Sequence, residues 1–265
     1  MTGTTMKIRL LLSVLALAAV ACGGDIEQKC YIQRPALGGY GIVFTATAAA
    51  SGTCGAAENA FLADTIGDIW MMDKFREDQS QLGIRPGLLL PHGAPAADGT
   101  FTIALPTAAS LSLGDFAALT PDASHLCKVP TMTSVTGEGA VAAGITLAIS
   151  NVVFLTGSLY QGSQMEVDAT WGLNSCTRTY HGIGITPIVN CDPAASNACD
   201  PLGNPSAGVP ASGVNPDFPV SCSAAAGALF PNRYTGPGGS GAQPLGQPNG
   251  DPVCFLTGST FPQLK

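Results

Sequence analysis

The chain has 265 residues and a formal net charge of −7, with 46% hydrophobic residues, 11% charged residues, 33 Gly, 20 Pro and 9 Cys. The apolar content excludes a wholly disordered chain, the lack of a three-residue glycine period excludes collagen, and the scarcity of Glu and Lys excludes a coiled coil. Because no basic stripe is present to neutralise phosphates, we expect no nucleic-acid partner.

The first segment has the pattern of an export signal. Lys7 and Arg9 precede an apolar stretch over residues 10–20, and small residues surround Cys22. This order is typical of a secretory signal peptide, and the stretch is shorter than the roughly 20 residues of a membrane span. The small residues ending at Cys22 resemble a bacterial lipobox, in which the cysteine is lipidated. An ordinary secretory signal is the alternative, and either Met1 or Met6 could be the start.

We therefore expect a lipoprotein signal peptide over residues 1–21, and a lipid anchor and tether over residues 22–35. Removal of the signal leaves a mature chain with a net charge near −9, which is not attracted to anionic lipid. Membrane attachment would therefore depend on the acyl chains on Cys22. Gly23, which follows that cysteine, resembles an outer-membrane sorting signal.

The cysteine count supports lipidation of Cys22. Nine cysteines are an odd number, and setting Cys22 aside leaves eight, which can form up to four disulfides in an oxidising compartment. Their pairing stays open, because eight cysteines allow about a hundred connectivities. The disulfide candidates are Cys30, Cys54, Cys127, Cys176, Cys191, Cys199, Cys222 and Cys254.

The first predicted elements follow the tether. Residues 41–47 are β-branched or aromatic and predict a strand, residues 56–63 favour a short helix, and residues 65–75 predict a second strand. Residues 76–81 are polar and predict a loop. Residues 100–105 alternate between apolar and small or polar side chains, which predicts a half-buried strand ended by Pro106.

Three further segments predict an antiparallel meander. Residues 145–155, 165–171 and 176–185 are apolar and alternating, and residues 172–175 supply a turn. In the last segment Tyr180 points to one face, and Ile183 and Ile185 point to the other. We therefore expect an all-β fold over residues 36–189, an antiparallel sandwich or barrel of roughly seven to nine strands.

The composition changes after Thr186. Residues 187–265 contain 13 of the 20 Pro and 11 of the 33 Gly, which would interrupt strands too often for a regular sheet. Residues 190–265 are therefore predicted to form a loop-rich, disulfide-stapled C-terminal extension that lies on the β domain.

Several short motifs occur in an order that resembles a known group of proteins. They are Gly114-Asp115-Phe116 with Pro121-Asp122, Cys127 and Val129-Pro130; Ser150-Asn151-Val152; Cys176-Thr177-Arg178-Thr179-Tyr180 with Gly182-Ile183 and Pro187; and residues 212–218 with Val220 and Cys222. Over residues 30–225 the chain resembles the uncharacterised cysteine-rich surface lipoproteins of myxobacteria and related bacteria, from which it departs in residues 232–251. The resemblance implies a compartment and an architecture, but no activity.

Metal chemistry has little support in the sequence. His92, His125 and His181 are isolated from one another, and no zinc-type spacing is present. Cys191 and Cys199 favour disulfide bonding over zinc in an exported chain. The Asp- and Asn-containing loop over residues 191–204 could supply oxygen ligands to calcium, but such residues also favour turns. We expect no metal and no cofactor.

Catalytic patterns are weak as well. No GxSxG motif occurs, and a triad of a serine with His181 and Asp168 is a hypothesis that distant residues permit in most chains. Glu166 and Asp168 share one face of a strand at a separation of about 7 Å, which suits a carboxylate pair, but a solvated strand face is the simpler interpretation. We therefore expect no catalytic residue.

The best-supported function is that of a non-enzymatic surface lipoprotein. We expect export to the cell envelope, outer-membrane anchoring through lipid on Cys22, and a structural, adhesive or partner-binding role with an unknown protein or envelope partner. The alternative is a β-barrel that binds a small ligand or carbohydrate, with residues 70–72 lining its pocket instead of its core. A hydrolase is the third hypothesis.

Overall fold

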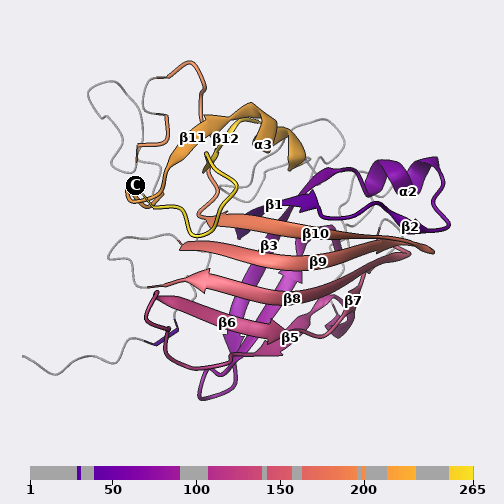
Figure 1. Cartoon of the computed structure of the whole chain (residues 1–265), viewed down its shortest axis with the longest axis horizontal. Coiled ribbons are helices and arrows are strands. Elements are labelled where there is room, and N and C mark those ends of the chain that lie inside the picture. The colour runs from indigo at the N-terminus through magenta and orange to yellow at the C-terminus, as the bar shows by residue number, and fades with distance from the viewer. Residues whose placement is uncertain are drawn as a thin grey trace, which may run out of the picture.

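The computed structural model describes residues 29–30, 39–89, 107–138, 142–156, 163–195, 198–200, 214–230 and 251–264. Eight antiparallel strands of this part form one curved sheet in the order β5-β4-β3-β1-β10-β9-β8-β6 (Figure 1). They are β1 (Tyr40–Ala46), β3 (Thr65–Phe75), β4 (Gln81–Pro86), β5 (Ser112–Asp115), β6 (Leu126–Thr131), β8 (Ile145–Leu155), β9 (Ser163–Leu173) and β10 (Cys176–Thr186).

Shorter elements lie at the margins of this sheet. The two-residue strand β2 (Ser51–Gly52) pairs with β10, and β7 (Val135–Thr136) pairs with β8. A short helix, α2 (Ala56–Phe61), precedes β3, and two 3-10 turns, η1 (Gly87–Leu89) and η2 (Ala108–Ser110), lie on either side of the undescribed segment 90–106.

The two ends of the strand order meet and nearly close the sheet into a barrel. Ala117, just after β5, donates its backbone N–H to the Lys128 carbonyl in β6 at 2.8 Å, and Thr133 donates to the Leu113 carbonyl at 2.8 Å. Because these bonds join the outermost strands, they protect edges that would otherwise be open to pairing with another chain. The prediction of an all-β antiparallel fold is confirmed, with a barrel-like form.

The strongest sequence patterns predicted their elements well. The strands predicted over residues 65–75, 145–155 and 176–185 correspond to β3, β8 and β10, and the meander β8-β9-β10 is confirmed. The predicted strand over residues 100–105 lies outside the described residues. Strands β4, β5 and β6 were not predicted, because β4 contains Gly83 and ends at Pro86, β5 has four residues, and β6 contains Pro130.

Large side chains fill the barrel. Phe44 lies 5.3 Å from Trp70 and 6.0 Å from Trp171 between ring centroids, and all three side chains are completely buried. Glycines on β10 make room for this packing: Gly182 faces Phe44 across the β1–β10 pair, and a β-carbon there would lie 2.7 Å from the Phe44 ring. An eight-stranded barrel is just wide enough for its interior to be filled by side chains.

The C-terminal extension covers part of the outer face of the barrel. It contributes β11 (Val220–Ser223), α3 (Ala224–Leu229) and β12 (Val253–Leu256), and β11 pairs with β12 in a separate two-stranded sheet (Figure 1). A second hydrophobic core forms beneath it from the outward-facing Ile183 and Ile185 of β10 together with Phe218 and Val253. The predicted disulfide-stapled extension is confirmed, whereas its small sheet and helix were not predicted.

All eight predicted disulfide candidates are paired in the structure. The bonds are Cys30–Cys127, Cys54–Cys176, Cys191–Cys222 and Cys199–Cys254. The first two fasten the segment before β1 and the β2–α2 segment to the barrel, and the other two lie within the extension.

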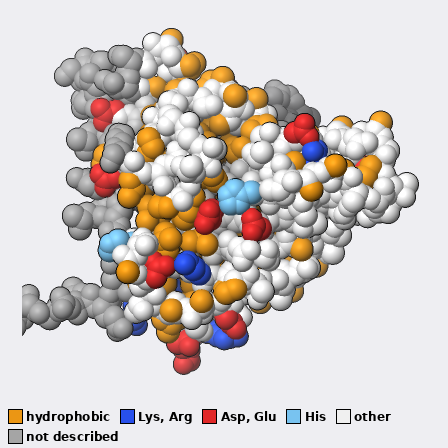
Figure 2. Space-filling view, in the orientation of Figure 1, with side chains coloured by type: hydrophobic (Ala, Val, Ile, Leu, Met, Phe, Trp, Pro, Cys, Tyr) orange, Lys and Arg blue, Asp and Glu red, His pale blue; other side chains and the backbone are white. Residues whose placement is uncertain are grey.

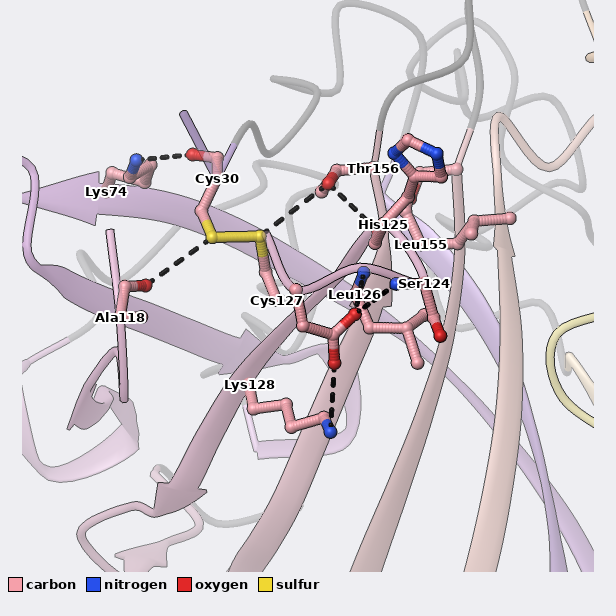
Figure 3. The surroundings of a disulfide bond; sticks show 12 residues. Cys30, Lys74, Ala118, Ser124, His125, Leu126, Cys127, Lys128, Leu155 and Thr156 are labelled. Carbon is pink, nitrogen blue, oxygen red and sulfur yellow. Dashed lines mark hydrogen bonds and ion pairs between the residues drawn. A yellow bond between two sulfur atoms is a disulfide. The ribbon is translucent and has the colours of Figure 1, made fainter. Parts of the chain in front are cut away.

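The first disulfide anchors the N-terminal segment (Figure 3). Cys30 bonds to Cys127 in β6, and the ammonium group of Lys74 donates to the Cys30 carbonyl at 2.6 Å. The same ammonium group lies 5.2 Å from the centroid of the Phe116 ring. Cys127 of β6 and Lys74 of β3 therefore both hold Cys30, in the segment before β1, to the barrel.

Candidate functional site

His181 lies at the centre of a polar cluster on the outer face of the barrel. It occupies β10 directly opposite Asp168 of β9 and Thr45 of β1. Nδ1 of His181 is 3.1 Å from Oδ1 of Asp168, and the side-chain amide of Asn151 donates to the other carboxylate oxygen at 2.8 Å. The strand period of two places Thr45, Asp168 and His181 outside, because their neighbours, such as Tyr180, fill the interior. Asn151 lies at the register shift of β8 between Ser150 and Val153.

Glu166 lies on the same face of β9 as Asp168, as the sequence predicted. Its Oε2 is 3.8 Å from Nε2 of His181, so the imidazole lies between two carboxylates. An imidazole flanked by acidic side chains is visible on the face shown in Figure 2. A serine triad would require a hydroxyl group at Nε2, where the structure instead places the Glu166 carboxylate.

The two carboxylates have opposite pKa shifts. Burial raises the pKa of Glu166, the negative charge of Asp168 raises it further, and the His181 and Lys128 charges only partly oppose these effects. Burial also acts to raise the pKa of Asp168, but hydrogen bonds from Asn151 and His181 outweigh it and hold that pKa below its ordinary value. Hydrogen bonds within the protein therefore stabilise the charged form of Asp168, whereas burial disfavours the charged form of Glu166.

A groove of about 330 Å³ opens beside His181, between the barrel and the extension. Its apolar lining includes Val43, Ile183 and Phe255, and its hydroxyl-bearing lining includes Thr45 and Ser259. Val43 and Ile183 are paired across β1 and β10, and Phe255 belongs to β12. His181 lines one end of this groove, and through its ring the groove borders the carboxylates of Glu166 and Asp168, which lie just outside the lining.

A reciprocal amide pair holds the segment that forms the outer wall of the groove. The side chain of Gln164 on β9 donates to the Gln263 carbonyl and accepts from the Gln263 backbone N–H at 2.9 Å. The side chain of Gln263 in turn bonds both backbone polar groups of Gly258, at 2.8 and 2.9 Å. Both glutamines are buried, so the wall is fixed to the barrel.

A second hollow of about 490 Å³ lies within the extension. It is lined by Asn215 and Phe218 and by parts of the segments around Cys199 and Cys222. Asp192, from the loop considered for calcium, accepts the Ala194 N–H at 2.9 Å and closes a local turn. Asn197 and Asn204 of that loop lie outside the described residues.

Within the described part of the chain, one group of three metal-type ligand atoms comes together. The sulfurs of Cys191, Cys199 and Cys254 lie within 4.8 Å of one another, but all three are in disulfides and offer no thiolate. Cys191 and Cys199 are thus both disulfide-bonded, to Cys222 and Cys254 respectively and not to each other.

The remaining predicted residues have simpler positions. Trp70 and Met72 are buried in the core, and Met71 faces outward with 36% exposure. His125 adopts a positive φ of 60° in the turn before β6. Cys22 and His92 lie outside the described residues.

Sequence reasoning missed the groove. Its β10 and β12 walls are separated by more than 60 residues along the chain, so no local sequence pattern marks the groove. β10 carries a weak signal of it. On the face opposite Tyr180, the polar His181 is followed two residues later by the apolar Ile183, so polar and apolar side chains meet on the outer face.

The fold and the cluster define a small, nearly closed antiparallel β-barrel with a disulfide-linked extension on its outer face. Residues 40–187, which run from β1 to just beyond β10, match MlpA. This match covers more than half of the chain, so the chain belongs to the MlpA family. Neither the curated proteins nor the solved structures contain a match to the chain. Among the described residues, no helix has the length and apolar character needed to cross a membrane.

Proposed function

We propose that this MlpA-family protein is an exported lipoprotein of the bacterial cell envelope, acylated at Cys22 and anchored in the outer membrane. Its barrel serves as a non-enzymatic scaffold whose outer face binds an envelope partner. One observation carries this proposal: the described barrel interior is filled by side chains such as Trp70 and Trp171, whereas the His181 groove opens on the outside.

The disulfides support export. Four disulfides join all eight cysteines that follow Cys22, and such bonds persist in oxidising compartments. Cys22 is then the cysteine left for lipid. Because disulfides constrain the unfolded chain, they also suit a domain exposed to the harsher conditions outside the cell.

The position of Cys30 supports a short tether. It lies eight residues after Cys22 and is bonded to β6, so the intervening chain can span at most about 29 Å when fully extended. An acylated Cys22 would therefore keep the barrel next to the membrane surface. Such a placement suits a scaffold that contacts other components of the envelope.

The cluster around His181 supports a binding role over a hydrolytic one. Both ring nitrogens face carboxylates, at 3.1 and 3.8 Å, so neither is positioned to activate a hydroxyl nucleophile. The carboxylates of Glu166 and Asp168 each contact the same imidazole, so His181 lies between the two groups that a glycosidase mechanism would need on either side of a substrate bond.

Metabolic labelling with an alkyne fatty acid tests the anchoring. We expect the wild-type chain to incorporate the label and to sediment with the outer membrane, and we expect globomycin to block its processing. Cys22→Ser should abolish labelling, whereas Cys30→Ser, the matched control, should retain it. Labelling of the Cys22→Ser chain, or processing that is insensitive to globomycin, would refute acylation at Cys22.

Site-specific photocrosslinking in intact cells tests partner binding. A photoreactive residue at the exposed Thr45, beside His181, is expected to capture a discrete envelope protein. The same residue at the exposed Asp78, in the loop between β3 and β4, serves as the control. Equal capture at both positions, or none at Thr45, would contradict a binding role for this face.

A further inference from the structure

We propose that the groove beside His181 binds an alkyl chain along Val43, Ile183 and Phe255, and that a primary ammonium group on this chain reaches Glu166, which borders the groove next to Ile183 and His181. This inference deepens the proposed function, because it names the ligand chemistry of the same outer face. It does not depend on how the chain is anchored.

Glu166 is the acceptor that such a ligand would satisfy. Its side chain is only 31% exposed, and its one charged contact within 4 Å among the described residues is the imidazole, at 3.8 Å. By contrast, Asp168 already accepts from Asn151 and contacts His181 at hydrogen-bond distance. A half-buried carboxylate without a close donor gains most from a ligand that brings both a proton donor and a positive charge.

The surrounding charges favour a cation. Besides His181, the described basic residue whose charge acts on Glu166 is Lys128, and its ammonium group is paired with Asp122 at 3.1 Å. The cluster therefore presents two carboxylates, Glu166 and Asp168, around one imidazole. An anionic ligand would meet repulsion there, whereas an ammonium group would meet complementary charge.

The groove supplies the apolar part of the site. Ile183 is paired with Glu166 across β9 and β10, and it lies two residues from His181 on the same face. Ile183 is also paired with Val43, so the apolar surface begins directly beside the carboxylate and continues across β1. Phe255 of the extension faces this surface, and the pair Gln164–Gln263 holds the adjoining wall in place.

The arrangement disfavours a metal ion. Asp168 and Glu166 contact opposite nitrogens of one imidazole and do not converge on a common point. Among the described residues, the three ligand atoms that do converge are disulfide sulfurs elsewhere. A ligand that is cationic at one end and apolar along its length fits both the charge and the lining.

Binding of n-alkylamines to the full oxidised chain tests the proposal. We expect hexylamine to bind and to shift the methyl NMR signals of Val43 and Ile183, with affinity rising about fourfold per methylene from butylamine to hexylamine. Hexanol, the neutral analogue of the same length, should bind about ten- to a hundredfold more weakly. Equal binding of hexanol, or no chain-length dependence, would overturn the proposal.

Two variants locate the charge. Glu166→Gln keeps the shape of the side chain and should weaken hexylamine about tenfold or more, with little effect on hexanol. Glu77→Gln, an exposed change in the loop after β3, is the matched control and should leave both affinities unchanged. Near-ultraviolet circular dichroism and disulfide mapping establish that each variant is folded. An unchanged hexylamine affinity in folded Glu166→Gln would refute the assignment.

A comparison of probes identifies the source of the ammonium group. Nα-acetyl-lysine methylamide mimics a lysine of a partner protein, whereas hexylamine mimics a free amphipathic amine. Tighter binding of the lysine derivative indicates a partner side chain, and tighter binding of the free amine indicates a small ligand. Each result supports alkylammonium recognition, and failure of both would overturn it while leaving the acylation result at Cys22 untouched.

Discussion

Cys222 and Cys254 lie directly opposite each other in the β11–β12 pair, yet each bonds to a cysteine outside that pair. Cys222 bonds to Cys191 and Cys254 bonds to Cys199. A bond between the two opposed cysteines would only join strands that backbone hydrogen bonds already hold. The observed bonds instead fasten both strands to the segment that follows β10.

The sulfurs of the two disulfides in the extension lie close together, which predicts disulfide exchange when the partner of Cys191 is removed. In Cys222→Ser the freed thiol of Cys191 would lie within 4.8 Å of the sulfurs of Cys199 and Cys254. Because a thiolate attacks a neighbouring disulfide, we expect a fraction of molecules to link Cys191 to Cys199 or Cys254. Peptide mapping without reduction measures the linkage. Cys127→Ser is the control, and a solely native Cys199–Cys254 bond in Cys222→Ser would contradict the expectation.

The disulfide Cys54–Cys176 is expected to stabilise the fold strongly, since it closes a loop with a sequence separation of 122. Replacing both cysteines with serine should lower the free energy of unfolding by about 2–5 kcal/mol. The pair Cys191–Cys222 has a separation of 31, so its removal should cost less in the chain-entropy account. Urea denaturation of the two double variants compares them. A larger loss for Cys191–Cys222 would argue against a loop-entropy origin.

Gly182→Ala should destabilise the barrel by overpacking it. The added β-carbon would lie 2.7 Å from the Phe44 ring, so the core must shift at a cost of about 1–3 kcal/mol. Phe44→Leu removes this contact at the cost of a cavity, so it should destabilise the Gly182→Ala chain less than it destabilises the wild type. Thermal unfolding measures both variants. A Gly182→Ala chain as stable as the wild type would show that the Phe44 ring does not exclude a larger side chain at position 182.

Gln164→Ala should loosen the C-terminal wall of the groove. The change removes two hydrogen bonds to Gln263 and leaves buried backbone groups without partners, at a cost of about 1–3 kcal/mol. Hydrogen exchange should quicken at the backbone amides of Gly258 and Gln263. Gln81→Ala, which removes a side-chain contact with Asp115 at the exposed surface, is the control. Unaltered exchange at Gly258 would show that other contacts hold the wall.

The raised pKa of Glu166 predicts a pH-dependent effect of Glu166→Gln on stability. The folded state disfavours the charged carboxylate, so wild-type stability is lost as pH rises through the raised pKa of the folded state. The variant lacks this loss and should be slightly more stable at neutral pH, with the difference vanishing below the ordinary pKa of 4.5. The effect is small because the side chain is partly exposed.

Asp168→Asn provides the contrast. The pKa of Asp168 is lowered, so its contribution to stability is present above the ordinary value of 3.8 and is lost as pH falls through the folded pKa. This variant should therefore be less stable than the wild type at neutral pH. Urea unfolding at neutral and acidic pH measures both variants, and the same sign for the two would contradict the opposite shifts.

Local patterns determined much of the fold. Strands β3, β8 and β10 were predicted with bounds close to those observed, because a strand with one face in the core must alternate, and alternation is readable along the chain. The side chains of Glu166 and Asp168 were placed on one face for the same reason. The even number of cysteines after Cys22 allowed four disulfides.

Only the tertiary structure decided the closure of the barrel, the disulfide pairing and the groove. Each depends on contacts between distant segments: Leu113 with Thr133, Cys54 with Cys176, and His181 with the extension that carries Phe255. Such contacts follow from how whole strands pair and how an extension packs, and period and composition do not encode them locally. The sequence by itself therefore determined the strands, their faces and the cysteine parity, whereas the packing of strands and extension created the site.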